Sequence, residues 1–281
     1  MRRFPLLSYF VLASLLSWLA WAPLAAVGLG WSTIHASPYL HLAGGFGPMI
    51  AALVVTTWCD GRPGLIRLAV RCTDARGRLA SLAIAVAAPL CLFAVSALAL
   101  NVSGLGEVAW ADVGRSVEYP ALNRPVFWLA NILCYGFGEE VGWRGFALPR
   151  IQARRTALTS AILVSGAWAA WHLPLFAFTA GMSSMGMAGV AGWLFSLVTG
   201  SILLTWLFNR SNGSVLAVAL FHGVLDIVMT SPVKGALPSV MGTIIMLWGL
   251  AIPFTLGRAN LSRLPRVRDL ADRAPPHIDP R

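Results

Sequence analysis

Two adjacent glutamates, Glu139 and Glu140, are the first candidates for chemistry in this sequence. They lie inside the run 126–148, which is otherwise apolar enough to form a membrane helix. An acidic side chain at the centre of a membrane helix costs about 2.5–3.5 kcal/mol even on the more lenient insertion scales. Ionisable residues are therefore rare at such depth and mark functional sites by default. We interpret the pair as the centre of a site.

Helical spacing gives the two glutamates different roles. Glu140 and Arg144 are four residues apart, so they share a helix face with the acid on the favourable N-terminal side. Glu139 points about 100° away and needs another partner. A desolvated carboxylate without a neighbouring cation has the properties of a general base near neutral pH. The alternative is that both acids are paired, buried and inert.

Two further apolar runs carry histidines at depth. Pro174 follows His172 closely, and it is expected to kink the helix and turn the ring towards a cavity. His222 and Asp226 are four residues apart and project to one side, towards the protein interior. The alternative for these groups is a set of hydrogen bonds between helices.

The three patterns together resemble a known family. Glu139-Glu140-x-x-x-Arg144, Trp168-x-x-x-His172 and His222-x-x-x-Asp226 are similar to the motifs EExxxR, FxxxH and HxxxN or HxxxD of the CPBP family. This family comprises CAAX-type prenyl proteases and bacteriocin-processing enzymes, also called Abi proteins. The similarity covers about 125–231.

Two positions depart from the family pattern. Trp168 stands where Phe is commonest, which is a mild aromatic exchange. Asp226 stands where the prenyl proteases have Asn. An Asn amide can donate a hydrogen bond to an oxyanion, whereas an ionised Asp cannot. The exchange puts a simple oxyanion role, and prenyl-protein cleavage as the specific reaction, in doubt.

The resemblance implies hydrolysis of a peptide bond within the membrane. Glu139 and His172 would activate a water, and His222 with Asp226 would stabilise the oxyanion. Glu140 and Arg144 would orient the helix that carries them, and Trp168 would help to position the site. The catalytic residues expected are Glu139, Glu140, His172, His222 and Asp226. The same residues admit two versions of this chemistry. In one, zinc or another divalent metal is bound; in the other, the glutamate acts without a metal. The metal ligands would be Glu139, His172, His222 and Asp226.

The composition fits an all-α, polytopic membrane bundle. The chain has 281 residues, of which 57% are hydrophobic and only 11% charged. Apolar stretches long enough, or nearly so, to cross a bilayer core at about 20 residues each predict about eight transmembrane helices. The predicted spans are 5–29, 42–58, 80–100, 126–148, 157–178, 187–208, 214–231 and 236–257. A cleaved signal peptide is disfavoured, because the first apolar run is too long and more spans follow.

The net charge is +10, and the positive residues are distributed as the predicted membrane topology requires. Arginines concentrate in the loops that would be cytoplasmic if the N-terminus is inside the cell. This distribution predicts that both termini lie in the cytoplasm. The predicted location is the cytoplasmic (plasma) membrane, which the protein would cross several times. A nucleic-acid partner is disfavoured because no soluble domain would present a basic patch. The partners expected are membrane lipid and a peptide or membrane-anchored protein substrate.

The chain divides into an N-terminal part with the first three spans (1–124), a core of four spans (125–231), a last span (232–257) and a basic tail predicted to be disordered (258–281). The four cysteines show no paired spacing, so neither a disulfide framework nor a zinc site of the Cys type is predicted.

Two other classes of function remain open. A catalytically silent membrane scaffold or bacteriocin self-immunity protein would use the same bundle without cleavage. A proton- or cation-coupled transporter would use the buried acids as carriers, but the sequence has no detectable repeated halves. Substrate identity and oligomeric state are not predicted.

Overall fold

The computed structural model describes residues 2–75, 78–104, 108, 110–231 and 237–268. Within these ranges the chain is helical, with no strand, as the composition predicts. Large apolar side chains lie on the outside, among them Leu19 and Phe254, which are 70% and 76% exposed. Such a surface suits a lipid environment, because in water it would favour aggregation.

The described residues before Arg124 form four α-helices and a short 3-10 turn, η1 (Trp110–Asp112). The α-helices are α1 (Pro5–Gly28), α2 (Tyr39–Gly45), α3 (Gly47–Thr73) and α4 (Leu79–Ser103). The predicted second span, 42–58, is too short, because helical structure from Tyr39 continues to Thr73. Gly61 kinks α3 with φ 61° and ψ −156°, a conformation that glycine adopts without the steric cost that other residues bear. The kink lets the polar second half of the helix change direction.

The helical run that contains the glutamates extends from Arg124 to Gln152 and is irregular. It consists of α5 (Arg124–Asn131), a π-helical segment η2 (Ile132–Phe137), α6 (Gly138–Glu140), a second π-helical segment η3 (Val141–Ala147) and α7 (Leu148–Gln152). The α6 turn, with Glu139 and Glu140, therefore lies between two π-helical segments. Wide turns of this kind are rare and occur frequently at functional sites.

The C-terminal part contains the remaining helices. They are α8 (Ala157–Trp171), α9 (Leu175–Phe178), α10 (Ala180–Ser183), α11 (Met187–Arg210), α12 (Val215–Met229) and α13 (Leu237–Leu256). The predicted span 157–178 is wrong in length, because α8 ends at Trp171 and His172 caps it. Pro174 precedes α9, so the proline ends the helix near His172 and does not merely kink it.

Five helices among the described residues are long and apolar enough to cross a membrane. They are Pro5–Gly28, Tyr39–Thr73, Leu79–Ser103, Met187–Arg210 and Leu237–Leu256, and the shorter Ala157–Trp171 and Val215–Met229 are also apolar. The count of eight spans is not confirmed. The α5–α7 run is polar at its centre and broken by π-helical segments, so it does not form one regular apolar helix.

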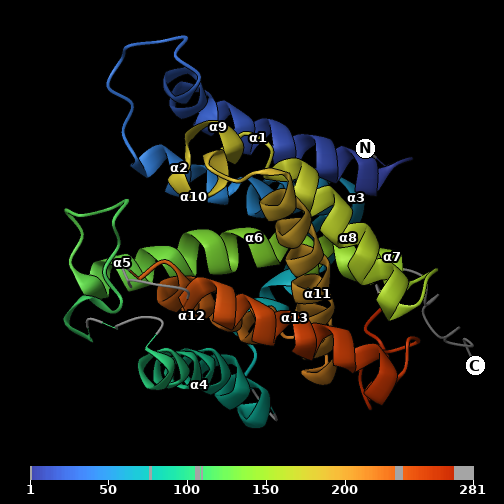
Figure 1. Cartoon of the computed structure of the whole chain (residues 1–281). Coiled ribbons are helices and arrows are strands. Elements are labelled where there is room, and N and C mark those ends of the chain that lie inside the picture. Colours follow the sequence, from blue (N-terminus) through green and yellow to red (C-terminus); the bar gives the residue numbers. More distant parts are fainter. Residues whose placement is uncertain (1, 76–77, 105–107, 109, 232–236, 269–281) are drawn as a thin grey trace, which may run out of the picture.

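The helices enclose the α6 turn. α1 packs along α3, α12 packs against both α4 and η2, and α11 packs against α8 and α13. In Figure 1 the run from α5 to α7 crosses the middle of the molecule, with α1 above it and α12 below. Elements distant in the sequence thus surround Glu139 and Glu140, and these residues can meet side chains from α8 and α12.

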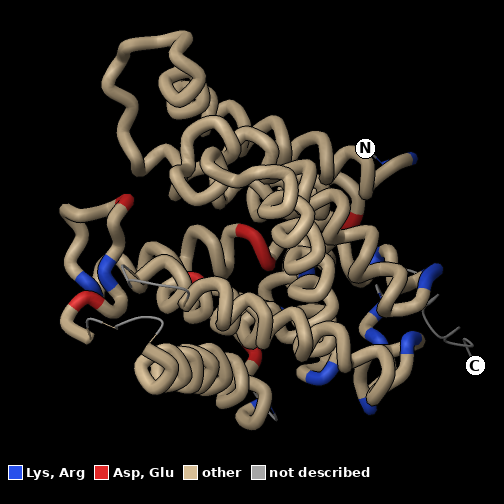
Figure 2. The backbone as a smooth tube through the Cα atoms, in the orientation of Figure 1, with Lys and Arg blue, Asp and Glu red and all other residues tan. Residues whose placement is uncertain are grey.

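Charge is distributed unevenly over the fold. Figure 2 shows most of the blue segments towards the side of the molecule where α7 and the end of α13 lie, and a red segment at α6 in the centre. The opposite end, near α5, carries Arg115 paired with Asp112 at 4.0 Å and Glu118 paired with His41 at 2.7 Å. The arginine-rich end is the one that the sequence analysis assigns to the cytoplasm. The orientation in the membrane stays a prediction.

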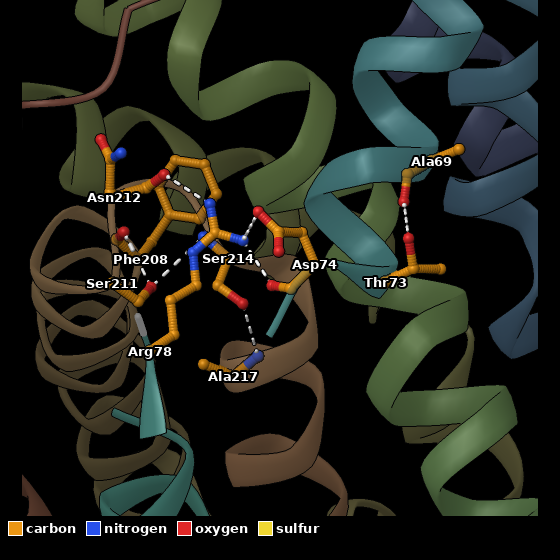
Figure 3. A network of polar contacts seen from close by, with 9 residues as sticks. All are labelled: Ala69, Thr73, Asp74, Arg78, Phe208, Ser211, Asn212, Ser214 and Ala217. Atoms are coloured by element: carbon orange, nitrogen blue, oxygen red, sulfur yellow. Dashed lines mark hydrogen bonds and ion pairs between the residues drawn. The ribbon is translucent and has the colours of Figure 1, made fainter. Parts of the chain in front are cut away.

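Polar contacts fasten the loops at the arginine-rich end. Figure 3 shows Arg78, just before α4, paired with Asp74 at 3.2 Å and donating to the Asn212 carbonyl at 3.4 Å. Ser214 caps α12 by accepting a hydrogen bond from the Ala217 amide at 3.2 Å. The hydrogen bond from Arg78 to Asn212 joins the α3–α4 connection to the α11–α12 connection. It therefore fixes the start of α12, the helix that carries His222.

The segment after α13 is held against the core. Asn209 donates to the Asn260 carbonyl at 2.9 Å, Gln152 donates to the Val267 carbonyl at 2.7 Å, and Leu261 is fully buried. The prediction of a disordered tail from 258 is therefore wrong up to residue 268. Residues 269–281, and the predicted start of the last span at 232–236, lie outside the described residues.

The α6 turn depends on a close backbone approach at Gly138. A Cβ at this position would lie 2.5 Å from the Gly45 carbonyl oxygen. We expect Gly138→Ala to destabilise the protein by about 1–3 kcal/mol, because α6 must move away from α2. Gly166→Ala is the matched control, since a Cβ there meets nothing within 4 Å. Thermal unfolding in detergent measures both, and equal midpoints would contradict the close packing.

Candidate active site

Glu140 is the buried anchor of the site. Its Oε1 accepts a hydrogen bond from Arg144 Nη1 at 2.8 Å and another from His222 Nδ1 at 2.9 Å. The side chains of Glu140 and Arg144 are both fully buried. The pairing of Glu140 with Arg144, predicted from their spacing, is present. The contact with His222 was not predicted, and it makes Glu140 the link between α6 and α12.

Glu139 faces a different partner. Its Oε2 accepts a hydrogen bond from the indole Nε1 of Trp168 on α8 at 2.7 Å, and the residue is only 4% exposed. In the described part of the chain, no Arg, Lys or His lies within ion-pair distance of this carboxylate. The separation of the two glutamates onto different faces therefore holds. Glu139 keeps lone pairs that no charged partner occupies.

The tautomer of His172 follows from its hydrogen bond. Its Nδ1 lies 2.7 Å from the Trp168 carbonyl oxygen. A carbonyl oxygen only accepts, so Nδ1 must carry the proton. In the neutral ring, Nε2 then has a free lone pair and can hold a water or receive a proton. The end of α8 at Trp171 allows this geometry, because the His172 ring reaches back along the last turn.

Trp168 connects the elements of the site. Its indole N–H holds Glu139 and its carbonyl holds His172. Its ring lies 4.8 Å from the Arg144 guanidinium and 5.6 Å from the His222 ring centroid. A phenylalanine could supply the ring contacts but not the N–H donor. The exchange of Phe for Trp, which the sequence suggests is mild, therefore adds a specific contact with Glu139.

His222 and Asp226 line the other side of the site, on α12. His222 Nε2 lies 3.7 Å from Asp226 Oδ2, and the Asp226 side chain is 31% exposed. The His222 ring is thus set between two carboxylates, with Nδ1 directed to Glu140 and Nε2 directed towards Asp226. When both nitrogens carry protons, Nε2–H is available as a donor near the exposed edge of the site.

The predicted metal ligands do not form a preassembled metal centre. Glu139, His172, His222 and Asp226 are of the types that bind zinc. Over the described residues, however, no group of three or more His, Cys, Asp or Glu side chains is arranged to hold a metal ion. Glu139 is turned towards Trp168 and His222 towards Glu140. These side chains would have to move to bind a common ion.

Other residues that support the site were not predicted. Ser17 on α1 accepts a hydrogen bond from Trp171 Nε1 and donates one to the Gly44 carbonyl, both at 2.7 Å. Trp18 donates to the Trp171 carbonyl at 2.9 Å. These contacts fix α1 and α2 to the end of α8, directly before His172. A serine and tryptophans in an apolar helix give no sequence signal for this role.

Comparison with known proteins agrees with the motifs. Residues 121–228 match the family described as Rce1-like, type II CAAX prenyl endopeptidase. The matched segment contains all seven predicted site residues and confirms the resemblance to the CAAX-type protease family. No curated protein matches the chain. The match covers less than half of the chain, and it makes this segment similar to a family of endopeptidases.

The Trp168–Glu139 hydrogen bond can be tested by removing only the donor. We expect Trp168→Phe to lower stability by about 1–3 kcal/mol, because it leaves a buried carboxylate oxygen without that donor. Trp206→Phe, in the contact between α11 and α13, is the control for loss of an indole. Unfolding free energies in detergent measure both variants. If the Trp168 variant loses no more stability than the control, the hydrogen bond does not contribute as described.

Proposed function

We propose that the chain is an intramembrane endopeptidase in which Glu139 activates a water to hydrolyse a peptide bond. The observation that carries this proposal is the state of Glu139. It is buried and has a neutral indole N–H, that of Trp168, as its hydrogen-bond partner, and the carbonyl of the same tryptophan binds His172 Nδ1 and leaves Nε2 of that ring free. A carboxylate in this setting can take a proton from water, which a carboxylate paired with arginine does poorly.

The first step joins water to the substrate carbonyl. Water bound between Glu139 and His172 Nε2 transfers a proton to the Glu139 carboxylate, and its oxygen attacks the carbonyl carbon. The resulting oxyanion needs a donor that is already in position. His222 Nε2–H is suited to this, because Glu140 holds the ring through Nδ1 at 2.9 Å.

The second step breaks the peptide bond. The carboxylic acid now on Glu139 donates its proton to the leaving nitrogen as the C–N bond breaks, which restores the carboxylate and releases an amine and a carboxylic acid. Trp168 keeps the Glu139 side chain directed at the site throughout. Glu140 and Arg144 take no proton in this scheme. They position His222 by means of their buried ion pair.

Asp226 has a supporting part in this mechanism. Its carboxylate lies 3.7 Å from His222 Nε2, too far for a normal hydrogen bond, and it is partly exposed. An ionised Asp226 favours the doubly protonated His222, and so it supports the oxyanion donor without donating a hydrogen bond itself. With Asp226 in place of the Asn of the prenyl proteases, the oxyanion loses an amide donor at this position but keeps the donor of His222 Nε2–H.

A metal-dependent version would use other positions of the same side chains. A bound divalent ion would supply an activated water. Because the four predicted ligands do not converge in this arrangement, we propose the metal-free version, and no step above depends on a metal.

The setting of the reaction is also part of the proposal. We infer about eight spans, with both termini in the cytoplasm and the protein in the plasma membrane. The arginine distribution supports this orientation, since positively charged loops stay on the cytoplasmic side. The substrate is a peptide or membrane-anchored protein, and lipid surrounds the bundle. A silent scaffold or an immunity protein is the competing function, and it would not require a reactive Glu139.

The proposal is tested by peptide cleavage with detergent-purified protein. Fluorogenic CAAX-like peptides and double-glycine leader peptides are incubated with wild type and with Glu139→Gln. We expect the variant to lose at least about 100-fold in rate, because general-base catalysis contributes about 10²–10⁴-fold. Chelator treatment should leave the wild-type rate unchanged.

The matched control is Glu118→Gln, which removes a 41% exposed carboxylate that is hydrogen-bonded to His41 and lies outside the three motifs. It should cleave as wild type does. Loss of activity on chelation would overturn the metal-free mechanism but keep the endopeptidase. Equal cleavage by wild type and Glu139→Gln would refute the role of Glu139, and a folded wild type that cleaves nothing would favour the scaffold.

A further inference from the structure

A cavity adjoins the site between α8, α11, α12 and α13. Its volume is about 160 Å³, and Trp168, His222 and Asp226 form part of its wall. Most of the remaining wall is apolar, including the buried side chains of Leu203 and Phe221. The mechanism proposed above uses the polar wall but gives no role to the apolar part.

The size of the cavity limits what it can hold. An apolar cavity of about 150 Å³ accepts a molecule as large as benzene. The present cavity therefore suits one branched aliphatic or aromatic side chain. An isoprenoid chain of fifteen or more carbons would not fit inside it. The hydroxyl of Ser196, which also lines the cavity, already donates to the Trp193 carbonyl at 2.8 Å. A polar guest would thus find few free partners apart from the catalytic groups.

Two glycines line this space. Gly200 on α11 and Gly242 on α13 both line the cavity, and a Cβ at either position would meet nothing within 4 Å. By contrast, Gly249 on α13 allows close packing, since its Cβ would lie 2.2 Å from the Thr199 carbonyl oxygen. Gly200 and Gly242 are therefore not needed for helix contact, and a larger residue at either one would project into open space.

We propose that this cavity binds one apolar side chain of the substrate, from a residue next to the bond that is cleaved, and that Gly200 and Gly242 set the size of that side chain. The inference rests on the proposed function. His222 and Asp226 belong both to the cavity wall and to the oxyanion side of the site, so an occupant lies within one residue of the reacting carbonyl. Burial of an apolar side chain here would also hold the peptide in place for attack.

The test is a change of substrate preference. Two peptide series carry Ala, Leu or Phe directly before or directly after the cleaved bond, and kcat/KM is measured for each peptide. We expect wild type to prefer Leu over Ala by at least about tenfold in one series, because each methylene in an apolar pocket contributes to discrimination. Gly200→Leu and, separately, Gly242→Leu should each reduce this ratio about tenfold by filling the cavity.

Gly192→Leu is the matched control. It adds the same side chain to α11, at a glycine whose Cβ also meets nothing within 4 Å but which does not line the cavity. The control should keep the wild-type ratio. An unchanged ratio in both cavity variants, with cleavage intact, would overturn the inference while leaving the proposed function in place.

A binding measurement separates the two proposals if wild type cleaves no peptide. The thermal midpoint of Glu139→Gln is measured with the Leu and Ala peptides, with and without the added Gly200→Leu change. Greater stabilisation by the Leu peptide, lost when the cavity is filled, would support the cavity as a binding site even though hydrolysis had failed. Equal stabilisation by both peptides would overturn it.

Discussion

The buried carboxylate of Glu140 is the constraint on which the rest of the site depends. A charge at this depth is tolerated only when it is paired and hydrogen-bonded, and removal of one partner from a buried pair costs about 3–5 kcal/mol. Glu140 meets this requirement through one oxygen, Oε1, which accepts from Arg144 in its own helical run and from His222 on α12. The hydrogen bond between Glu140 and His222 thereby fixes the position of α12 relative to α6, and with it the position of Asp226.

This arrangement leaves Glu139 available for chemistry. Because Glu140 pairs with Arg144, the hydrogen bond of the neighbouring Glu139 among the described residues comes from the neutral Trp168 indole, and the carbonyl of Trp168 orients His172. On one side of the site, Glu140 is paired with Arg144 and His222. On the other side, Glu139 and His172 have lone pairs that can accept a proton. The π-helical segments on both sides of α6, and the close approach of Gly138 to Gly45, place both glutamates inside the bundle.

Helical spacing predicts the pairing of Glu140 with Arg144 and the separation of Glu139 from it, because both depend only on residues close in the sequence. The all-helical class followed from composition, and the family resemblance is confirmed over 121–228. Helix limits were less predictable. Hydropathy does not reveal that α8 ends before His172 or that π-helical turns interrupt the central run. The contacts of Ser17 with Trp171 and of Glu140 with His222 join residues distant in the sequence, and only the fold brings them together.

The most direct test of this account is a double-mutant cycle between Glu140 and His222. Unfolding free energies in detergent are compared for wild type, Glu140→Gln, His222→Asn and the double variant. Residues in one hydrogen-bonded network show coupling of about 0.5–3 kcal/mol, and the buried 2.9 Å contact predicts a value towards the upper end. If the two single effects add within about 0.3–0.5 kcal/mol, as for independent sites, Glu140 does not hold α12 in place and the account is contradicted.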